Sequence, residues 1–411
     1  MVLTYRPAPS PLTGDRALRV LFIVQGEGRG HMTQALAVRQ MLTAHGHTVT
    51  HTLVGRSARR QVPVFFAEGI ATPITCFDSP NFVTGKGDAT VRMWPTAWYN
   101  ATRLGSYARS LKTMDGVVKA EQPDVIVSFY EGLTGLYTKL YRPKAPVVTV
   151  GHQFLFLHPS YPFGAGNAAQ RRGAQLYTRF TSMGAAARIG LSLYQARDLP
   201  SEGIAVVPPI LRDEVFELMH TRRRDVHEAE DFLLVYLLEA AMGEELMAWS
   251  DRNPDVKLHC FWDRFDQPDE WAYNDALTFH HLSGTKFLEK MARCRGVVCT
   301  AGFESVSEAM LLGKPLFMVP VRGHIEQQWN ALDAVEQGAG ITAPSLDLDL
   351  FMEYLPTHAT DPQSFRDWVA QAERRVISVI EGVAGLDPLV PAGDGAADWT
   401  QHANQDRVAT A

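Results

Sequence analysis

Three residues in the second half of the chain are spaced so that they could bind a phosphorylated ligand. Gly302, Ser305 and Glu308 lie in TAGFESVSEAMLLGKPLFMVP, residues 300–320, where an apolar strand gives way to a helix. Gly302 permits close backbone approach, and Ser305 in the first helical turn can meet a phosphate, because a helix N-terminus presents free N–H groups and a positive dipole end. Glu308 projects from the same face about one turn deeper and could hold ribose hydroxyls. This spacing indicates a nucleoside diphosphate; the alternative is a capping serine with a glutamate that the dipole alone favours.

Two polar residues follow the next apolar strand and suit a sugar. Glu326 and Gln327 come shortly after Pro320, in the loop or first helical turn. Open α/β sheets bind ligands beyond the carboxyl ends of their strands, so both side chains are expected at the same edge as Ser305. Each alone is an ordinary helix-start residue. In this order and spacing, the set predicts that a sugar ring is held beside a diphosphate.

The first strand of the chain also ends in a glycine-rich junction. VQGEGRGHMTQ, residues 24–34, places Gly26 and Gly28 as the first two glycines of a dinucleotide-binding fingerprint. His31 occupies the third glycine position, and no acidic residue that could hold a ribose hydroxyl follows before Glu68. A nicotinamide-dinucleotide site is therefore disfavoured here.

His31 is instead a candidate general base. It opens a helix at the carboxyl edge of the sheet, and a neutral imidazole can take a proton from a hydroxyl nucleophile near neutral pH. Glu131, directly after the apolar run VIVSFY, is the candidate carboxylate that would orient it. The alternatives are a histidine that caps or packs under a loop and a solvated glutamate at a helix start.

Composition restricts the class of protein. The chain has 411 residues, a formal net charge of -6 and 46% hydrophobic residues, so it is globular and has no overall attraction to nucleic acid. Its four cysteines lack metal-ligand spacing, and its start lacks a secretory signal, which together favour a reduced cytoplasmic interior. Because no apolar window approaches the roughly 20 residues of a membrane span, any membrane contact is expected to be peripheral.

The pattern of apolar runs predicts two α/β domains. Short β-branched runs alternate with amphipathic stretches along most of the chain, which is typical of parallel sheets covered by helices. A proline pair and a charge-rich stretch near residue 210 mark the boundary. The predicted organisation is a flexible segment 1–18, a first domain 19–210, a second domain 211–356, a helical segment 357–383 and an unstructured tail 384–411.

The sequence resembles the GT-B fold glycosyltransferases, in particular the group that contains MurG and the UDP-glycosyltransferases of natural products. TAGFESVSEAMLLGKPLFMVP with EQQWNA is similar to their donor-binding stretch, and GEGRGHMTQALAV is similar to their N-terminal acceptor-side loop. The resemblance implies two Rossmann-like domains facing across a cleft, with the acceptor on the first and the donor on the second.

The resemblance also implies roles for individual residues. Gly302 and Ser305 would contact the diphosphate and Glu308 the ribose, while Glu326 and Gln327 would contact the sugar. His31 would be the base or lie against the phosphosugar. Gly30 and His152 would lie on the acceptor side; for His152, a buried loop histidine is the alternative.

Three features depart from the family pattern. Thr300 stands where related plant enzymes have a diphosphate-binding histidine, and Glu304 stands where they have asparagine. A carboxylate close to a diphosphate is unfavourable, so we expect Glu304 to point away from it. The loop VYLLEAAMGEE has only Gly243 where MurG-like enzymes are glycine-rich, which leaves open whether residues 239–243 still support catalysis.

The predicted function is an inverting transfer of sugar from a UDP-sugar to a hydroxyl of a small-molecule or lipid-linked acceptor, without a metal ion or cofactor. The aromatic segment GHQFLFLHPSYPF, residues 151–163, could receive an apolar acceptor or be core. Asp347 and Asp349 are interpreted as surface residues. Three alternatives remain: a non-catalytic nucleotide-sugar-binding protein, a nucleotide-sugar 2-epimerase of the same fold, and an NADP-dependent oxidoreductase using the arginines near Arg56.

Overall fold

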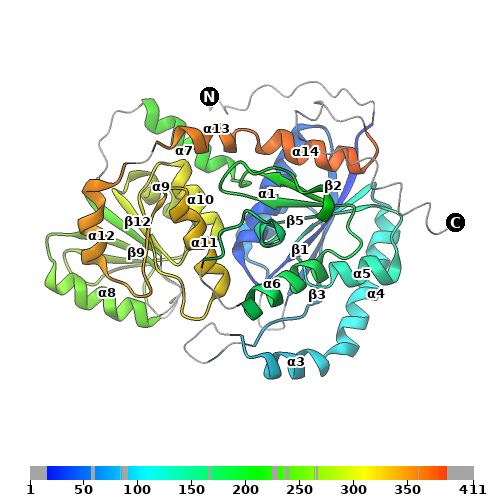
Figure 1. Cartoon of the computed structure of the whole chain (residues 1–411), viewed down its shortest axis with the longest axis horizontal. Helices are drawn as coiled ribbons and strands as arrows, with labels where there is room; N and C mark the ends of the chain where they lie inside the picture. The colour runs from blue at the N-terminus through cyan, green and yellow to red at the C-terminus, as the bar shows by residue number, and fades with distance from the viewer. Residues whose placement is uncertain are drawn as a thin grey trace.

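The chain forms two domains, each built on a mainly parallel sheet covered by helices (Figure 1). This confirms the predicted α/β class with two Rossmann-like domains. The structure is a computed structural model, and the residues that it describes are 16–56, 61–83, 85, 91–164, 168–224, 230–236, 240–262, 264, 267–359 and 361–386.

The first domain contains a parallel sheet with the strand order β3-β2-β1-β4-β5-β6-β7. Its central strands are apolar runs that are buried on both faces, as expected for a sheet between two helical layers. The elements are β1 (Arg19–Gln25), α1 (Arg29–Ala44), β2 (Thr48–Arg56), α2 (Val64–Ile70), β3 (Ile74–Asp78), α3 (Met93–Ala101), α4 (Leu104–Glu121), β4 (Val125–Phe129), α5 (Thr134–Tyr141), β5 (Val147–Gly151), a 3-10 helix (His152–Leu157), α6 (Ala168–Thr181), β6 (Ala187–Leu191), a second 3-10 helix (Pro200–Glu202) and β7 (Ile204–Val207).

The second domain repeats this arrangement. Its sheet has the order β10-β11-β9-β8-β12-β13-β14, parallel except for the edge strand β10, which runs antiparallel to β11. The elements are α7 (Asp213–Arg224), β8 (Phe232–Tyr236), α8 (Ala240–Arg252), β9 (Lys257–Trp262), β10 (Glu270–Ala272), β11 (Leu277–His281), α9 (Gly284–Arg293), β12 (Gly296–Cys299), α10 (Phe303–Leu311), β13 (Leu316–Met318), α11 (Ile325–Glu336), β14 (Gly340–Thr342), α12 (Leu348–Tyr354) and a 3-10 helix (Leu355–Thr357).

The helical segment after the second sheet returns to the first domain. α13 (Gln363–Val369) packs against α10, and α14 (Ala372–Val383) lies against α1, β6 and β7, along the top of the molecule in Figure 1. A buried contact of 3.0 Å between His47 Nε2 and Glu381 Oε1 joins α14 to the loop after α1. α13 and α14 therefore connect the two domains by packing against both.

The two ends of the chain lie largely outside the described residues. Residues 1–15 and 387–411 are not described, and these contain most of the predicted flexible segment and tail. Leu18, which the prediction placed in the flexible segment, is buried and donates its backbone N–H to His47 Nδ1. Among the described residues, no helix has the length and apolar character needed to span a membrane.

Candidate active site

The junction between β12 and α10 has an open helix N-terminus. Gly302 is the N-cap, with extended backbone (φ -67°, ψ 132°) and no side-chain capping bond, and a Cβ there would meet no atom of the described residues within 4 Å. The preceding Ala301 is in the left-handed region (φ 59°), where non-glycine residues are uncommon and tend to occur at ligand sites. Ser305 is the third helical residue and does not cap the helix. The neighbouring helices α9 and α11 are capped by side chains, from Ser283 and His324. The α10 N-terminus is thus available for an anion.

Glu308 is buried one turn further along α10 and forms an ion pair across the link between the domains. Its Oε1 accepts a hydrogen bond of 2.8 Å from Nε of Arg212, which follows β7. Burial raises the pKa of Glu308, and the charge of Arg212 opposes that shift. A Cβ on Gly284 would lie 3.0 Å from Arg212 Nη1, so the guanidinium also lies against the start of α9. Sequence reasoning missed Arg212, because no motif surrounds it.

Glu326 and Gln327 lie in the first turn of α11, beyond the carboxyl end of β13. Glu326 is half-buried, and its Oε1 accepts from Gln153 Nε2 of the first domain at 3.1 Å. Burial raises the pKa of this carboxyl group, and His324 opposes the shift. Gln327 is buried, and its side-chain oxygen accepts from the backbone N–H of Val321 at 2.8 Å, which holds the β13–α11 loop. The two residues share the sheet edge with Ser305, as predicted.

His31 occupies the junction between β1 and α1, at the third position of a helix whose N-cap is Gly28. Its Nδ1 lies 3.3 Å from Gln34 Oε1, and its ring stacks on Tyr130 with a centroid distance of 5.7 Å. Burial lowers the pKa of His31 to about 4, despite the hydrogen bond to Gln34. The imidazole is therefore neutral at pH 7 and can accept a proton.

Glu131 does not orient His31, which corrects the sequence-based prediction. Its carboxylate is fully buried and accepts hydrogen bonds from the Ser79 hydroxyl and from the backbone N–H of Leu133. Burial raises its pKa to about 7, against these hydrogen bonds. The partner of His31 is Gln34, three residues further along the same helix. The i, i+3 spacing was present in the sequence and could have identified it.

His152 lies in the interior between the domains and not on an acceptor surface. It is 2% exposed, its Nε2 lies 2.9 Å from Asn330 Oδ1 of α11, and its ring stacks on Phe303 at 4.0 Å. Burial lowers its pKa to about 4. Of the two predictions for this residue, the buried loop histidine is the one that matches the structure.

The aromatic segment 151–163 is likewise core. Phe156, Tyr161 and Phe163 are buried in one cluster with Trp329 of α11. Ring-centroid distances of 5.1 Å and 4.9 Å join Trp329 to Phe156 and Phe163. The aromatic side chains of the segment therefore hold the two domains together and are too buried to contact an apolar acceptor.

The two helix N-termini meet at the domain interface. A Cβ on Gly30, in the first turn of α1, would lie 3.2 Å from Glu304 Cγ in the first turn of α10. The carboxylate of Glu304 accepts a 2.6 Å hydrogen bond from Gln34 Nε2. Gly30 thus contacts the second domain, and Glu304 is directed at Gln34. The loop VYLLEAAMGEE has a low glycine content, and its residues 237–239 lie outside the described residues.

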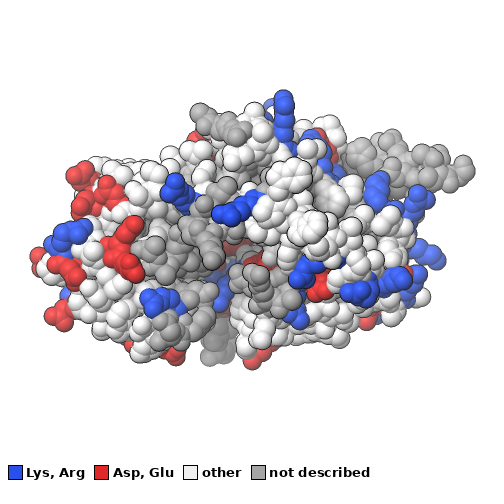
Figure 2. All heavy atoms as spheres, turned by 90° about the horizontal axis from the view of Figure 1, so that it is seen from below, with Lys and Arg blue, Asp and Glu red and all other residues white. Residues whose placement is uncertain are grey.

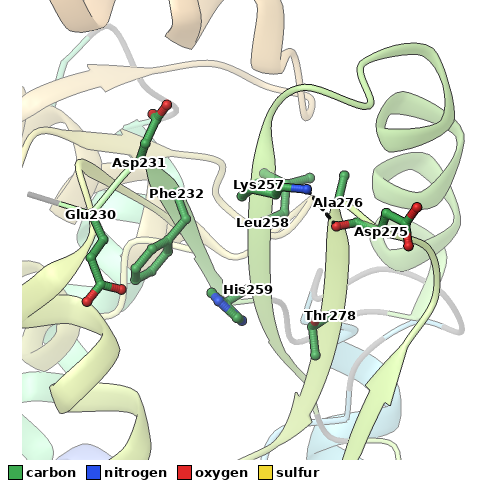
Figure 3. A pocket seen from close by; sticks show the side chains of 9 residues that line it. All are labelled: Glu230, Asp231, Phe232, Lys257, Leu258, His259, Asp275, Ala276 and Thr278. Carbon is green, nitrogen blue, oxygen red and sulfur yellow. Dashed lines mark hydrogen bonds between the residues drawn. The ribbon is translucent and has the colours of Figure 1, made fainter.

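A separate hollow of about 310 Å³ lies at the opposite edge of the second sheet. Figure 3 shows that its lining comes from the starts of β8, β9 and β11, whereas the residues described above follow the carboxyl ends of strands. Three of its charged side chains already have partners: Glu230 pairs with Arg293, Asp231 with Arg295 at 2.8 Å, and Lys257 with the Asp275 carbonyl at 2.8 Å. The candidate site is therefore assigned to the junctions and not to this hollow.

Comparisons with known proteins agree with this geometry. A family model for glycosyl transferase family 1 matches residues 18–357, whereas no curated protein sequence matches. The calicheamicin glycosyltransferase CalG4 is 15% identical over 96% of this chain and 98% of its own, with a TM-score of 0.54. MurG of Acinetobacter baumannii is 16% identical over 88% and 99%, with a TM-score of 0.52. LpCGTa is 14% identical over 96% and 100%, with a TM-score of 0.55.

At these identities the solved structures show the shared fold, and the family model shows the family. The family model indicates sugar transfer, in place of nicotinamide chemistry or binding without catalysis. The chain is a GT-B glycosyltransferase and belongs to glycosyl transferase family 1.

Proposed function

We propose that this enzyme transfers a sugar from a UDP-sugar to an acceptor hydroxyl with inversion at the anomeric carbon. The observation that carries the proposal is the opposition of two junctions: the open α10 N-terminus on one domain and the neutral His31 on the other. A solved structure of the similar protein LpCGTa is a complex with UDP, which supports UDP as the nucleotide.

His31 takes the proton of the acceptor hydroxyl as its oxygen attacks the anomeric carbon. The bond from that carbon to the diphosphate breaks, and the electron pair leaves with the nucleotide. Backbone N–H groups and the hydroxyl of Ser305 at the start of α10 receive the developing charge, which is electrostatic stabilisation at a fixed helix end. The helix end supplies the positive potential, so the proposal needs neither a metal ion nor a cofactor.

Thermal-shift measurements test the donor assignment. UDP, GDP, dTDP and several UDP-sugars are compared, because a ligand that binds only the folded state raises its apparent stability. Glu308→Gln is the preferred variant, since its amide oxygen can still accept from Arg212 while the charge is lost. We expect a UDP-selective shift that Glu308→Gln reduces. No shift across the panel would contradict the donor assignment.

We further propose an apolar or lipid-linked acceptor that is reached at a membrane surface. The support is the region of α3, where Trp94, Trp98 and Leu104 are 88%, 75% and 66% exposed. Trp94 and Trp98 are four residues apart and share a helix face. Residues 91–114 contain no Asp or Glu and carry four cations: Arg92, Arg103, Arg109 and Lys112. Exposed tryptophans with basic neighbours are typical of helices that lie on anionic lipid.

This surface is connected to the catalytic junction. Asn100 in α3 donates to the Asn81 carbonyl at 2.9 Å, and Asn81 donates to Glu27 Oε2 at 3.1 Å, in the loop that leads to α1. α3 is the lowest helix in Figure 1, and Figure 2 looks at the molecule from that side. The four cysteines are free thiols, which is typical of proteins in a reducing compartment such as the cytoplasm.

Vesicle sedimentation tests the membrane surface. The protein is mixed with phosphatidylglycerol vesicles and, separately, with phosphatidylcholine vesicles. We expect binding to the anionic vesicles that weakens with salt and is lost in the double variant Trp94→Ser/Trp98→Ser. Phe82→Ser, which changes a less exposed aromatic residue outside α3, is the control. Equal binding by the double variant would contradict the assignment of the surface.

A further inference from the structure

We propose that Glu304 of the donor-side domain positions the imidazole of His31 in the acceptor-side domain through the side-chain amide of Gln34. The inference rests on the proposed function, because it takes His31 as the base. It assigns a role to a carboxylate at a position where the family pattern has none. It also means that the base is held in its working form only while the two domains are in contact.

The hydrogen-bond chemistry fixes one tautomer of His31. Nδ1 of His31 faces Oε1 of Gln34 at 3.3 Å, and an amide oxygen only accepts hydrogen bonds. Nδ1 must therefore carry the hydrogen, which leaves Nε2 with the free lone pair. A base that takes a proton from an acceptor hydroxyl needs that lone pair.

Glu304 decides which way the Gln34 amide points. Turned by 180°, the amide would offer its N–H groups to His31 and favour the opposite tautomer. Gln34 Nε2 lies 2.6 Å from Glu304 Oε1, and a carboxylate oxygen accepts from the N–H end of the amide. The carboxylate therefore selects the amide orientation, and the amide selects the tautomer.

The packing around Gln34 and Glu304 allows their side chains to come into contact. Gln34 is 3% exposed, and Glu304 can approach because Gly30 has no side chain: a Cβ there would lie 3.2 Å from Glu304 Cγ. The second oxygen of Glu304 is buried without a hydrogen-bond partner. A buried carboxyl oxygen without a hydrogen-bond partner destabilises the fold, so a contribution to stability does not explain this carboxyl group.

The charges around Glu304 set its protonation. Burial raises its pKa to about 8; the bond from Gln34 and the charge of Arg212 oppose this, and Glu308 adds to it. When His31 takes the acceptor proton, the new positive charge lies behind the Gln34 amide. With this pKa, Glu304 is mainly a neutral acid at pH 7, where its carbonyl oxygen accepts from Gln34. Above pH 8, the ionised Glu304 would also stabilise the imidazolium through that amide, as a carboxylate does for a histidine in direct contact.

Two substitutions at residue 304 separate positioning from packing. Glu304→Ala removes the acceptor for Gln34, whereas Glu304→Gln retains an oxygen that can accept from it. The first readout is the His31 tautomer, measured by ¹⁵N NMR on histidine-labelled protein at pH 7. The second is kcat across pH, and the third is UDP affinity.

We expect wild-type protein to carry the hydrogen on Nδ1 of His31. Glu304→Ala should give a mixture of tautomers and lower kcat by about tenfold with UDP affinity unchanged within about twofold. Glu304→Gln should restore the tautomer and most of the rate. Glu373→Ala is the matched control, because Glu373 contacts His45 at the other end of α1 at 3.1 Å, and it should change none of the three readouts.

Two results would overturn the proposal: a wild-type His31 protonated on Nε2, or a Glu304→Ala protein with an unchanged tautomer and kcat. The wild-type spectrum decides the first point even if no variant folds. The tautomer does not depend on turnover. A tautomer that responds to residue 304 in a protein that transfers no sugar would retain the relay and reject the proposed function.

Discussion

Two helices of this chain begin in the same way, each at a glycine with extended backbone. α1 starts after Gly28 and α10 after Gly302. Neither helix N-terminus has a side-chain capping bond, and a Cβ at either glycine would meet no atom of the described part of the chain within 4 Å. Each helix follows an inner strand of its sheet, β1 or β12. The third helical residue is His31 in one and Ser305 in the other.

The difference between those two residues shows how one local structure can serve two kinds of chemistry. Burial lowers the pKa of His31 to about 4, and the positive end of α1 acts in the same direction, because it disfavours an imidazolium. At α10 the same positive end has a hydroxyl beside it and open space next to Gly302, which suits an anion. In the proposed function, one helix end keeps the base neutral and the other binds the diphosphate.

The largest expected effect is on turnover, which distinguishes the β1–α1 junction from the β12–α10 junction. His31→Asn removes the proton acceptor while leaving α10 intact. We expect kcat to fall by about 10²- to 10⁴-fold, the usual contribution of general-base catalysis. Steady-state kinetics with a UDP-sugar and an accepted hydroxyl compound would measure it. UDP affinity should stay the same; a parallel loss of affinity would mean that His31 binds donor.

A matched pair of valine substitutions separates the junctions by donor binding. At both glycines the backbone is extended and open, so a side chain strains neither fold. Gly302→Val fills the space where a diphosphate would approach, and we expect UDP affinity to fall about a hundredfold, or about 2.7 kcal/mol. Gly28→Val should bind UDP as the wild type does.

Calorimetric titration with UDP gives both affinities, and melting curves show whether either variant is destabilised. If Gly302→Val bound UDP normally, or if both variants lost affinity equally, the α10 N-terminus would not be the diphosphate site.

The alternation of apolar runs predicted both sheets because most strands are buried on both faces. Strands such as VIVSF in β4 and VVTVG in β5 appear in the sequence as short segments rich in β-branched apolar residues. The edge strands β10 and β14 have three residues each, which is too short for an apolar run to stand out in the sequence, so they carried no such signal. Their pairing depends on the neighbouring strand and not on their own composition.

The site was predictable only where chemistry and spacing fall within one segment. Ser305, Glu326 and Gln327 lie at one sheet edge because parallel strands deliver them there. The partners Arg212 for Glu308 and Gln34 for Glu304 are 96 and 270 residues away in sequence, so only the docking of the domains reveals them.

Two aromatic segments also show that the sequence alone does not reveal which elements pack together. Phe156, Tyr161 and Phe163 of the segment 151–163 are buried against Trp329, whereas the tryptophans of α3 are exposed, although both segments are rich in aromatic residues. Composition could not tell them apart, because burial depends on whether another element covers the segment.

A pH experiment sharpens the comparison on the α1 side. Unfolded histidine has a pKa near 6.5, whereas the pKa of His31 in the folded protein is about 4. Between these values the unfolded state binds more protons, so this histidine lowers stability as pH falls below 6.5. We expect wild-type protein to lose about 1–2 kcal/mol more than His31→Asn between pH 7 and pH 5.

Denaturant unfolding of both proteins at the two pH values measures this difference. Burial raises the pKa of Glu131 to about 7 and that of Glu304 to about 8, so these groups stabilise the fold as pH falls. Both are present in wild type and variant, and their effect largely cancels in the comparison. Identical pH responses of the two proteins would show that His31 titrates normally in the folded state.

The smallest expected effect concerns the hydroxyl at the start of α10. Ser305→Ala removes one hydrogen-bond donor while the backbone N–H groups remain, and one such bond contributes about 0.5–1.5 kcal/mol. UDP affinity should therefore fall about two- to tenfold. Ser307→Ala is the control, because the Ser307 hydroxyl is buried and donates to the Phe303 carbonyl at 2.8 Å. That variant should lose stability and keep its UDP affinity. If Ser305→Ala bound UDP unchanged, the backbone alone would hold the anion. Ser305 and His31 would then share a position in their helices, but Ser305 would have no role in binding.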